Sequence, residues 1–142
     1  MTSTVLNGTD GYLAGGIKVA GDQVYVTIRN KTTGVISAQK LNADLSLAWS
    51  SDYSGGNVQA KALDVDGLGN MIVGVQGSYS ALSLVGFDVD GNEAWIQSAG
   101  SGNPVFLKFG TTGEIYLAGT FIGPSDSDGF MNRYGVTSLT CQ

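Results

Sequence analysis

The sequence predicts an all-β fold of three similar units, each a four-stranded antiparallel sheet. Three observations favour this fold. Short apolar runs are separated by turns rich in Gly, Asp and Asn, these runs repeat along the chain, and no apolar pattern has a helical period. The length of 142 residues suits a single domain, 1–142.

The central unit is the most regular. Strands are predicted at 62–65, 71–75, 81–88 and 93–97. The first turn reads DGLGN, where Gly supplies positive φ and Asp and Asn bond their own backbone, and the last turn, DGN, is a strong hairpin signal. Four short strands joined by such tight turns predict an antiparallel meander.

This unit has counterparts on both sides. Residues 82–95 (LSLVGFDVDGNEAW) align with 36–49 (ISAQKLNADLSLAW) at an offset of 46, and 63–73 (LDVDGLGNMIV) align with 107–117 (LKFGTTGEIYL) at an offset of 44. The first copy of the latter motif, IKVAGDQVYV from Ile17, fits with one residue deleted. The end of the chain also repeats, because FMNRYGVTS from Phe130 matches the stretch from Ser83 at an offset of 47.

The alignments define three repeats, at about 17–58, 59–103 and 104–142. Four-stranded units of about 40 to 50 residues have the spacing of β-propeller blades. The pattern DxDGxGN, aliphatic strand, third strand, DxDGNxxW resembles the bacterial β-propeller repeat family, with its Gly-Asn-strand … Asp-Gly-Asn-x-x-Trp signature. The first copy departs from it at 42–45, and the third has Gln142 in place of Trp. The resemblance implies propeller blades and an extracellular or surface location, but no particular chemistry.

The two ends of the chain predict self-association. By the alignment, Gln142 stands at the Trp49 position, inside a fourth strand, and residues 1–6 (MTSTVL) are suited to continue that strand. Propellers usually have about four to eight blades. We therefore expect a six-bladed ring, a homodimer in which each chain lends its N-terminal closing strand to the other; the alternative is that three blades were cut from a longer propeller. The self-association candidates are Thr4, Val5, Leu6 and Cys141.

Composition narrows the partners. The net charge is −5, and the seven Lys and Arg residues are scattered, which argues against nucleic acid and anionic membranes. Charged residues make up only 13% of the chain, against about 25% in typical domains, which favours either a surface hidden against a partner or a place in a crowded assembly. No apolar run reaches the roughly 18 residues of a membrane span, and the N-terminus lacks the pattern of a secretory signal. The compartment stays open, with an extracellular or particle surface favoured.

Histidine is absent, which removes Ser-His-Asp and Cys-His catalysis and the usual zinc sites. No catalytic residue and no cofactor are predicted. Closely spaced carboxylates allow a calcium site as a minor alternative, although turn chemistry explains the same residues and the EF-hand spacing is missing. The metal candidates are Asp64, Asp66, Asp88 and Asp90.

The repeats also align three charged residues, Lys18, Asp64 and Lys108, at one position of the first strand of each unit. In a propeller the first strand lines the central channel. These residues are therefore predicted either to ring the axis as a polar ligand site or to form salt bridges between blades, and the second interpretation is favoured.

Aromatic residues offer a second kind of binding site. Trp49 and Trp95 occupy equivalent places, which indicates a structural role. Tyr53 and Tyr79 are predicted in or near loops, where they could stack on sugars. The leading expectation is thus a non-catalytic binding or assembly module for glycans or a protein surface. The alternative is a structural component of a larger particle, such as a phage tail or virion-decorating protein, and a carboxylate-based enzyme comes third.

Overall fold

The structure is a computed structural model that describes residues 12–53, 55, 58–122 and 127–135. Within these residues it is all-β, with eleven strands in three antiparallel sheets and one short 3-10 helix. This confirms the predicted all-β class and its three antiparallel sheets. The described part of the chain has no helix long and apolar enough to cross a membrane.

Each sheet is a meander of consecutive strands. The first sheet comprises β1 (Tyr12–Ala20), β2 (Gln23–Asn30), β3 (Ile36–Leu41) and β4 (Leu47–Tyr53). The second sheet comprises β5 (Gln59–Val65), β6 (Met71–Gln76), β7 (Ala81–Phe87) and β8 (Glu93–Ser101), with the helix η1 (Ser78–Ser80) before β7. The third sheet comprises β9 (Asn103–Phe109), β10 (Glu114–Ile122) and β11 (Ser127–Gly135).

The three sheets follow the three predicted repeats. β1 begins at Tyr12, five residues before the aligned part of the first repeat at Ile17. The third sheet has three strands among the described residues; the predicted fourth strand, after residue 135, and the closing strand at 1–6 both lie outside them. The closed ring is therefore taken up below as a proposal.

Tight turns set the register of the second sheet, as the sequence predicted. The carboxylate of Asp66 accepts hydrogen bonds from the amides of Leu68 and Asn70, both at 2.9 Å, and from the Asn70 side chain at 2.8 Å. Asp88 repeats this geometry with the amides of Asp90 and Asn92 and with the Asn92 side chain. Because each carboxylate closes its own turn, the Asp-Gly motifs shape the hairpins that end β5 and β7.

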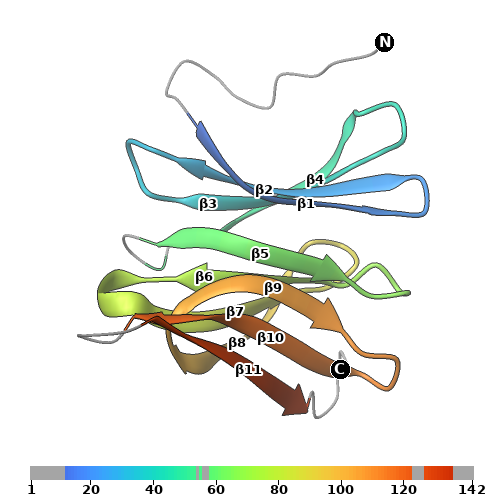
Figure 1. Cartoon of the computed structure of the whole chain (residues 1–142). Coiled ribbons are helices and arrows are strands. Elements are labelled where there is room, and N and C mark those ends of the chain that lie inside the picture. The colour runs from blue at the N-terminus through green and yellow to red at the C-terminus, as the bar shows by residue number, and fades with distance from the viewer. Residues whose placement is uncertain (1–11, 54, 56–57, 123–126, 136–142) are drawn as a thin grey trace.

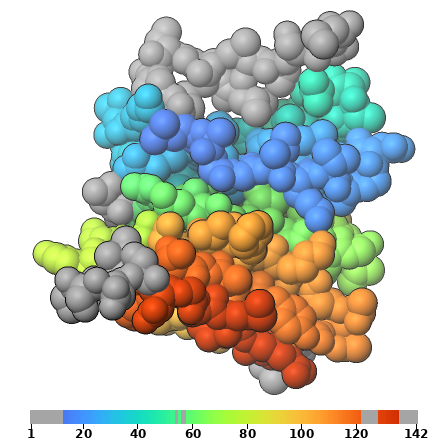
Figure 2. All heavy atoms as spheres, in the orientation of Figure 1, coloured from blue at the N-terminus to red at the C-terminus, as the bar shows by residue number. Residues whose placement is uncertain are grey.

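The sheets stack face to face in chain order, from the first at the top of Figure 1 to the third at the bottom. Figure 2 shows them as successive bands in close contact. One apolar core lies between the first and second sheets, around Tyr25, Met71 and Phe87, and a second lies between the second and third sheets, around Ile72, Leu84 and Leu117. The first strands of the sheets are neighbours, since β5 packs against both β1 and β9.

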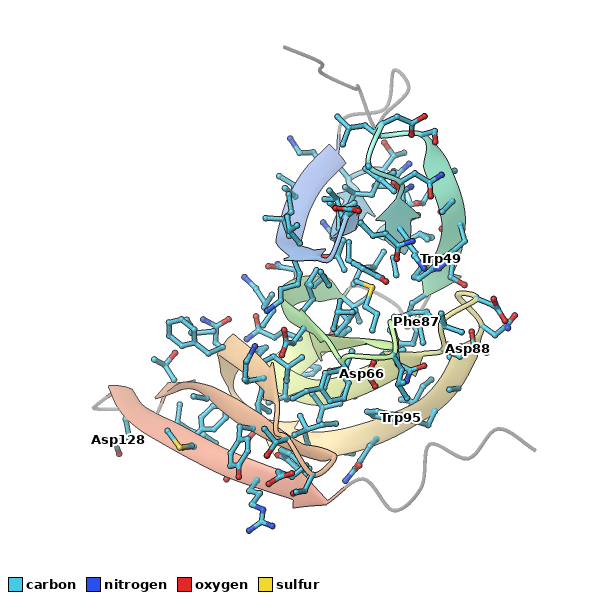
Figure 3. All side chains as sticks on the ribbon, turned by 90° about the vertical axis from the view of Figure 1, so that its right-hand side faces the viewer. Trp49, Asp66, Phe87, Asp88, Trp95 and Asp128 are labelled. Atoms are coloured by element: carbon cyan, nitrogen blue, oxygen red, sulfur yellow. The ribbon has the colours of Figure 1, made fainter. Side chains whose placement is uncertain are left out.

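The two equivalent tryptophans lie at equivalent boundaries between neighbouring sheets. Trp49 of β4 packs on Phe87 with a ring separation of 6.5 Å and donates a hydrogen bond of 3.0 Å to the carbonyl oxygen of Val89. Trp95 of β8 packs against the second core instead. In Figure 3 the two side chains lie on opposite sides of the second sheet. Each Trp therefore packs its sheet against the next one.

Candidate functional site

The three aligned charges meet in space. Asp64 of β5 is 1% exposed, and its two carboxylate oxygens take different partners. Oδ1 lies 2.8 Å from Nζ of Lys18 on β1, and Oδ2 lies 3.3 Å from Nζ of Lys108 on β9. Oδ2 also accepts a hydrogen bond of 2.8 Å from the amide of Phe109. The cluster therefore ties all three sheets together through their first strands.

Each charge in the cluster is stabilised by its neighbours. Burial raises the pKa of Asp64, but hydrogen bonds from the Lys18 ammonium and the Phe109 amide outweigh this, so the pKa lies below its ordinary value. The pKa of Lys18 lies above its ordinary value, chiefly because its ammonium donates to Asp64. The carboxylate is thus ionised at neutral pH, as the salt-bridge interpretation requires.

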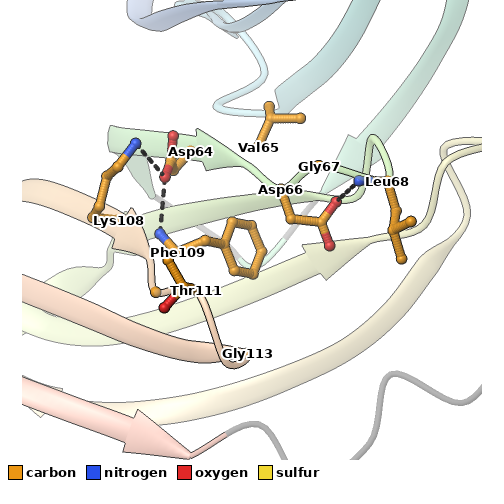
Figure 4. Close-up of a pocket in the computed structure, with 10 residues that line it drawn as sticks. Asp64, Val65, Asp66, Gly67, Leu68, Lys108, Phe109, Thr111 and Gly113 are labelled. Carbon is orange, nitrogen blue, oxygen red and sulfur yellow. Dashed lines mark hydrogen bonds and ion pairs between the residues drawn. The ribbon is translucent and has the colours of Figure 1, made fainter.

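A hollow of about 390 Å³ adjoins this cluster, between the β5–β6 and β9–β10 turns. Its charged lining residues are Asp64, Asp66 and Lys108, and Phe109 and Leu68 supply apolar walls. Figure 4 shows Asp64 bonded to Lys108 and Phe109, with Asp66 bonded to the Leu68 amide on the other side of the hollow. Both carboxylates therefore have partners within the protein.

The proposed calcium ligands are not brought together as a set. Asp66 and Asp88 each accept three hydrogen bonds within their own turns, and Asp64 is held by the two lysines. Asp90 is exposed in the β7–β8 turn. Among the residues that the structure describes, no three His, Cys, Asp or Glu side chains form a metal-binding group. Turn chemistry accounts for Asp66 and Asp88, and the salt bridges between sheets account for Asp64.

The two candidate sugar platforms differ. Tyr79 is fully exposed, with φ of 55° in the turn before β7. Tyr53 does not lie in a loop: it is the last residue of β4 and packs against the first core. The sequence predicted it in or near a loop, and cross-strand pairing with Ile36 places it at the end of the strand. Of the two, only Tyr79 presents an open ring face.

The outward face of the third sheet carries three exposed apolar side chains, beside Lys108, Glu114 and Arg133, and sequence reasoning missed them. Strand register places Phe106, Tyr116 and Met131 on this face, where they are 71%, 37% and 76% exposed. Their counterparts in the second sheet, by the repeat offsets of 44 and 47, are Ala62, Ile72 and Leu84, which are 7%, 0% and 0% exposed. The third sheet covers these counterparts, and among the described residues no sheet covers the third. The repeat alignment contained this signal.

At the opposite end of the stack, β1 also exposes apolar side chains on its outward face. Ile17 and Val19 of β1 are 70% and 62% exposed, and register places them on the face turned away from the second sheet. Val26 and Ile28 of β2 share this face and are buried. The counterpart of Ile17 in the third sheet, Leu107, is 7% exposed because it packs against the second sheet. The predicted self-association residues Thr4, Val5, Leu6 and Cys141 lie outside the described residues.

Comparison with known proteins shows a likeness in fold to solved structures. No family model matches the chain, and no curated protein matches it either. A solved structure that matches is a protein of unknown function from Bacteroides caccae, with a TM-score of 0.61 and 13% sequence identity. The match covers 92% of this chain and 49% of the other, so the chain spans about half the length of that protein. At this identity the likeness shows a shared fold alone.

Proposed function

We propose that this chain is a non-catalytic binding and assembly module that acts as a ring of six propeller-like blades formed by two copies. The observation that carries the proposal is the set of exposed apolar side chains on the outward face of the third sheet, Phe106, Tyr116 and Met131. Repetition supplies the reason: residues at the same positions of the second sheet are covered by the next sheet in the chain. In the ring, the first sheet of a second copy would cover the third sheet in the same way.

The fit between the two ends follows from the repeat. Inside the chain, one face of each sheet packs on the opposite face of the following sheet, through residues such as Ile72 against Leu107. If the same contact continues, the third sheet of one copy meets the first sheet of another, and Tyr116 approaches Ile17 of the second copy. Such a head-to-tail contact either closes into a ring or grows into a filament. Two copies give six blades, within the usual range of about four to eight.

The length of the Bacteroides caccae protein supports the same view, since about half of it has the fold of this chain. A non-catalytic role is supported by the lack of histidine in the sequence and by the partners of Asp64, Asp66 and Asp88. The exchange of residues 1–6 between copies remains a prediction, because these residues lie outside the described ones.

Mass in solution tests the ring. Sedimentation equilibrium of the full chain should give twice the monomer mass of 14.6 kDa at micromolar concentration. Met131→Asp places a charge on the outward face of the third sheet and should give the monomer. Leu68→Asp is the matched control, because Leu68 is 80% exposed in the β5–β6 turn, away from that face, and this variant should stay dimeric. A wild-type monomer contradicts the proposal, and mass that grows with concentration indicates open stacking, as in a particle component.

Ligand recognition by the module is the second part of the proposal. Tyr79 supports a glycan contact, since a fully exposed aromatic ring on a turn offers a flat apolar face for stacking. A glycan array with the wild type and with Tyr79→Ala tests it. Binding that Tyr79→Ala abolishes supports the contact, and equal binding by both proteins moves the recognition surface elsewhere. Tyr53→Phe is the control, because Tyr53 packs against the core.

A further inference from the structure

The Lys18–Asp64–Lys108 cluster contains two positive charges and one negative charge, one on the first strand of each sheet. Within one chain the order is Lys18, Asp64, Lys108, and the single carboxylate serves both lysines, at 2.8 and 3.3 Å. Each contact between neighbouring sheets therefore joins one lysine to one carboxylate. A net charge of −5 makes this local excess of positive charge notable.

The contact between copies breaks this alternation. In the proposed ring, the third sheet of one copy meets the first sheet of the other, so Lys108 faces Lys18 of the second copy. The aligned position that holds Asp64 within the chain is here taken by a second lysine. Two ammonium groups that lie close together repel each other, and no carboxylate of the cluster lies between these two. An anion in that position would supply what Asp64 supplies inside the chain.

The hollow beside the cluster would also lose its negative charges at the contact between copies. Inside the chain its lining includes the carboxylates of Asp64 and Asp66. At the contact between copies, the aligned positions are Lys108 and Gly110, so both carboxylates are replaced. Gly110 and Thr111 belong to the β9–β10 turn, as their counterparts Asp66 and Gly67 belong to the β5–β6 turn.

Two other carboxylates stand near this turn. Glu114 accepts hydrogen bonds from the amide and hydroxyl of Thr112, at 3.0 and 2.6 Å, and from the Tyr116 hydroxyl at 3.2 Å. These bonds lower its pKa to about 2, chiefly through the Thr112 hydroxyl, and occupy both of its oxygens. Asp22 of the second copy lies in the β1–β2 turn, where the first repeat has its one-residue deletion, and aligns with Thr112 or Gly113. Neither carboxylate stands at the Asp64 position.

We infer that each contact between copies is an oxyanion site, in which Lys108 of one copy and Lys18 of the other bind a carboxylate or phosphate group. The inference rests on the proposed ring, because the site is incomplete in one chain. Two such sites lie opposite each other in a ring of two copies. A ligand that carries an acidic group bridges the two chains there and holds them together.

The test couples anion binding to dimer formation, because a ligand that binds only the dimer must tighten it. Sedimentation equilibrium is run on the full chain in sodium chloride, sodium phosphate and sodium acetate at equal ionic strength. Phosphate or acetate should lower the dimer dissociation constant about tenfold relative to chloride, within the usual range for coupled binding. The two oxyanion arms show whether phosphate or carboxylate is preferred.

Three variants assign the effect to the proposed lysines. Lys108→Gln should abolish the response to oxyanions, and it leaves Asp64 paired with Lys18 and with the Phe109 amide. Lys108→Arg keeps the charge and should restore the response. Lys31→Gln removes a lysine from the exposed β2–β3 turn and should respond like the wild type.

The outcomes separate the two proposals. A dimer whose dissociation constant is the same in all three salts overturns the oxyanion site and leaves the ring intact. A response that persists in Lys108→Gln also overturns it. A monomer in every salt overturns the ring, and the site with it.

Discussion

Replacing Asp64 by Asn tests how much the cluster contributes to the fold. The substitution keeps the shape and one acceptor oxygen for the Phe109 amide but removes the charge that holds Lys18 and Lys108. Hydrogen bonds to charged groups contribute about 1.5–3 kcal/mol each. The lysine side chains are 32% and 65% exposed and regain water, and relief from burying a carboxylate offsets part of the loss. We expect a net loss of about 2 kcal/mol, which lowers the melting temperature by about 6 °C in a domain of this size.

The pH dependence gives this prediction a second measurement. The folded pKa of Asp64 is depressed, so its stabilisation is fully present above the unfolded value of about 4 and is lost as pH falls through the folded value. The folded pKa of Lys18 is raised above 10.5, so its share is present below that value and is lost as pH rises through the folded value. The melting temperatures of wild type and Asp64→Asn should therefore differ most between about pH 5 and 10, and the difference should shrink toward both extremes.

Calorimetry of both proteins from pH 2.5 to 11 measures the difference. Asp90→Asn is the matched control, because Asp90 is exposed in a turn and its loss should cost less than about 0.5 kcal/mol. A melting temperature of Asp64→Asn equal to that of the control at pH 7 would refute the reasoning. So would a difference that does not change with pH.

Three further predictions concern packing, and thermal unfolding checks each of them. Gly91→Ala should cost about 3 kcal/mol, since φ is +86° and a Cβ would lie 2.6 Å from the Trp49 ring; Gly21→Ala, at φ +58° with open space, should cost only about 1 kcal/mol. Trp49→Phe should cost about 1–2 kcal/mol, because it loses the hydrogen bond to the β7–β8 turn and part of the ring contact; a neutral result would mean that this bond contributes nothing. Leu117→Ala should cost about 2–5 kcal/mol at a site that is 0% exposed, while Leu68→Ala, at 80% exposed, should be nearly neutral.

The sequence predicted the strands and the cluster for identifiable reasons. Asp66 and Asp88 close their turns through their own side chains, so the hairpins depend on local chemistry that the sequence displays. Lys18, Asp64 and Lys108 were found by alignment, because equivalent positions in stacked repeats lie side by side. Neither the composition nor any single segment shows that these three residues pair with one another.

Other features depend on what lies next to a strand, which local sequence does not contain. Phe106 lies in an apolar run and Met131 follows Phe130, so their neighbours do not distinguish them from core residues, yet both face away from the second sheet. Only comparison with the buried Ala62 and Leu84 makes their exposure informative. Tyr53 was predicted in or near a loop, and only its pairing with Ile36 shows that it belongs to the end of β4.

The bond from the Phe109 amide to Asp64 has a consequence for solubility. β9 is an edge strand of its sheet. The unpaired backbone groups of an edge strand can pair with strands of other molecules, which leads to aggregation. Here a buried carboxylate from β5 occupies one edge amide and places charge beside the edge. The same side chain that joins the sheets thereby guards the chain against unwanted strand addition.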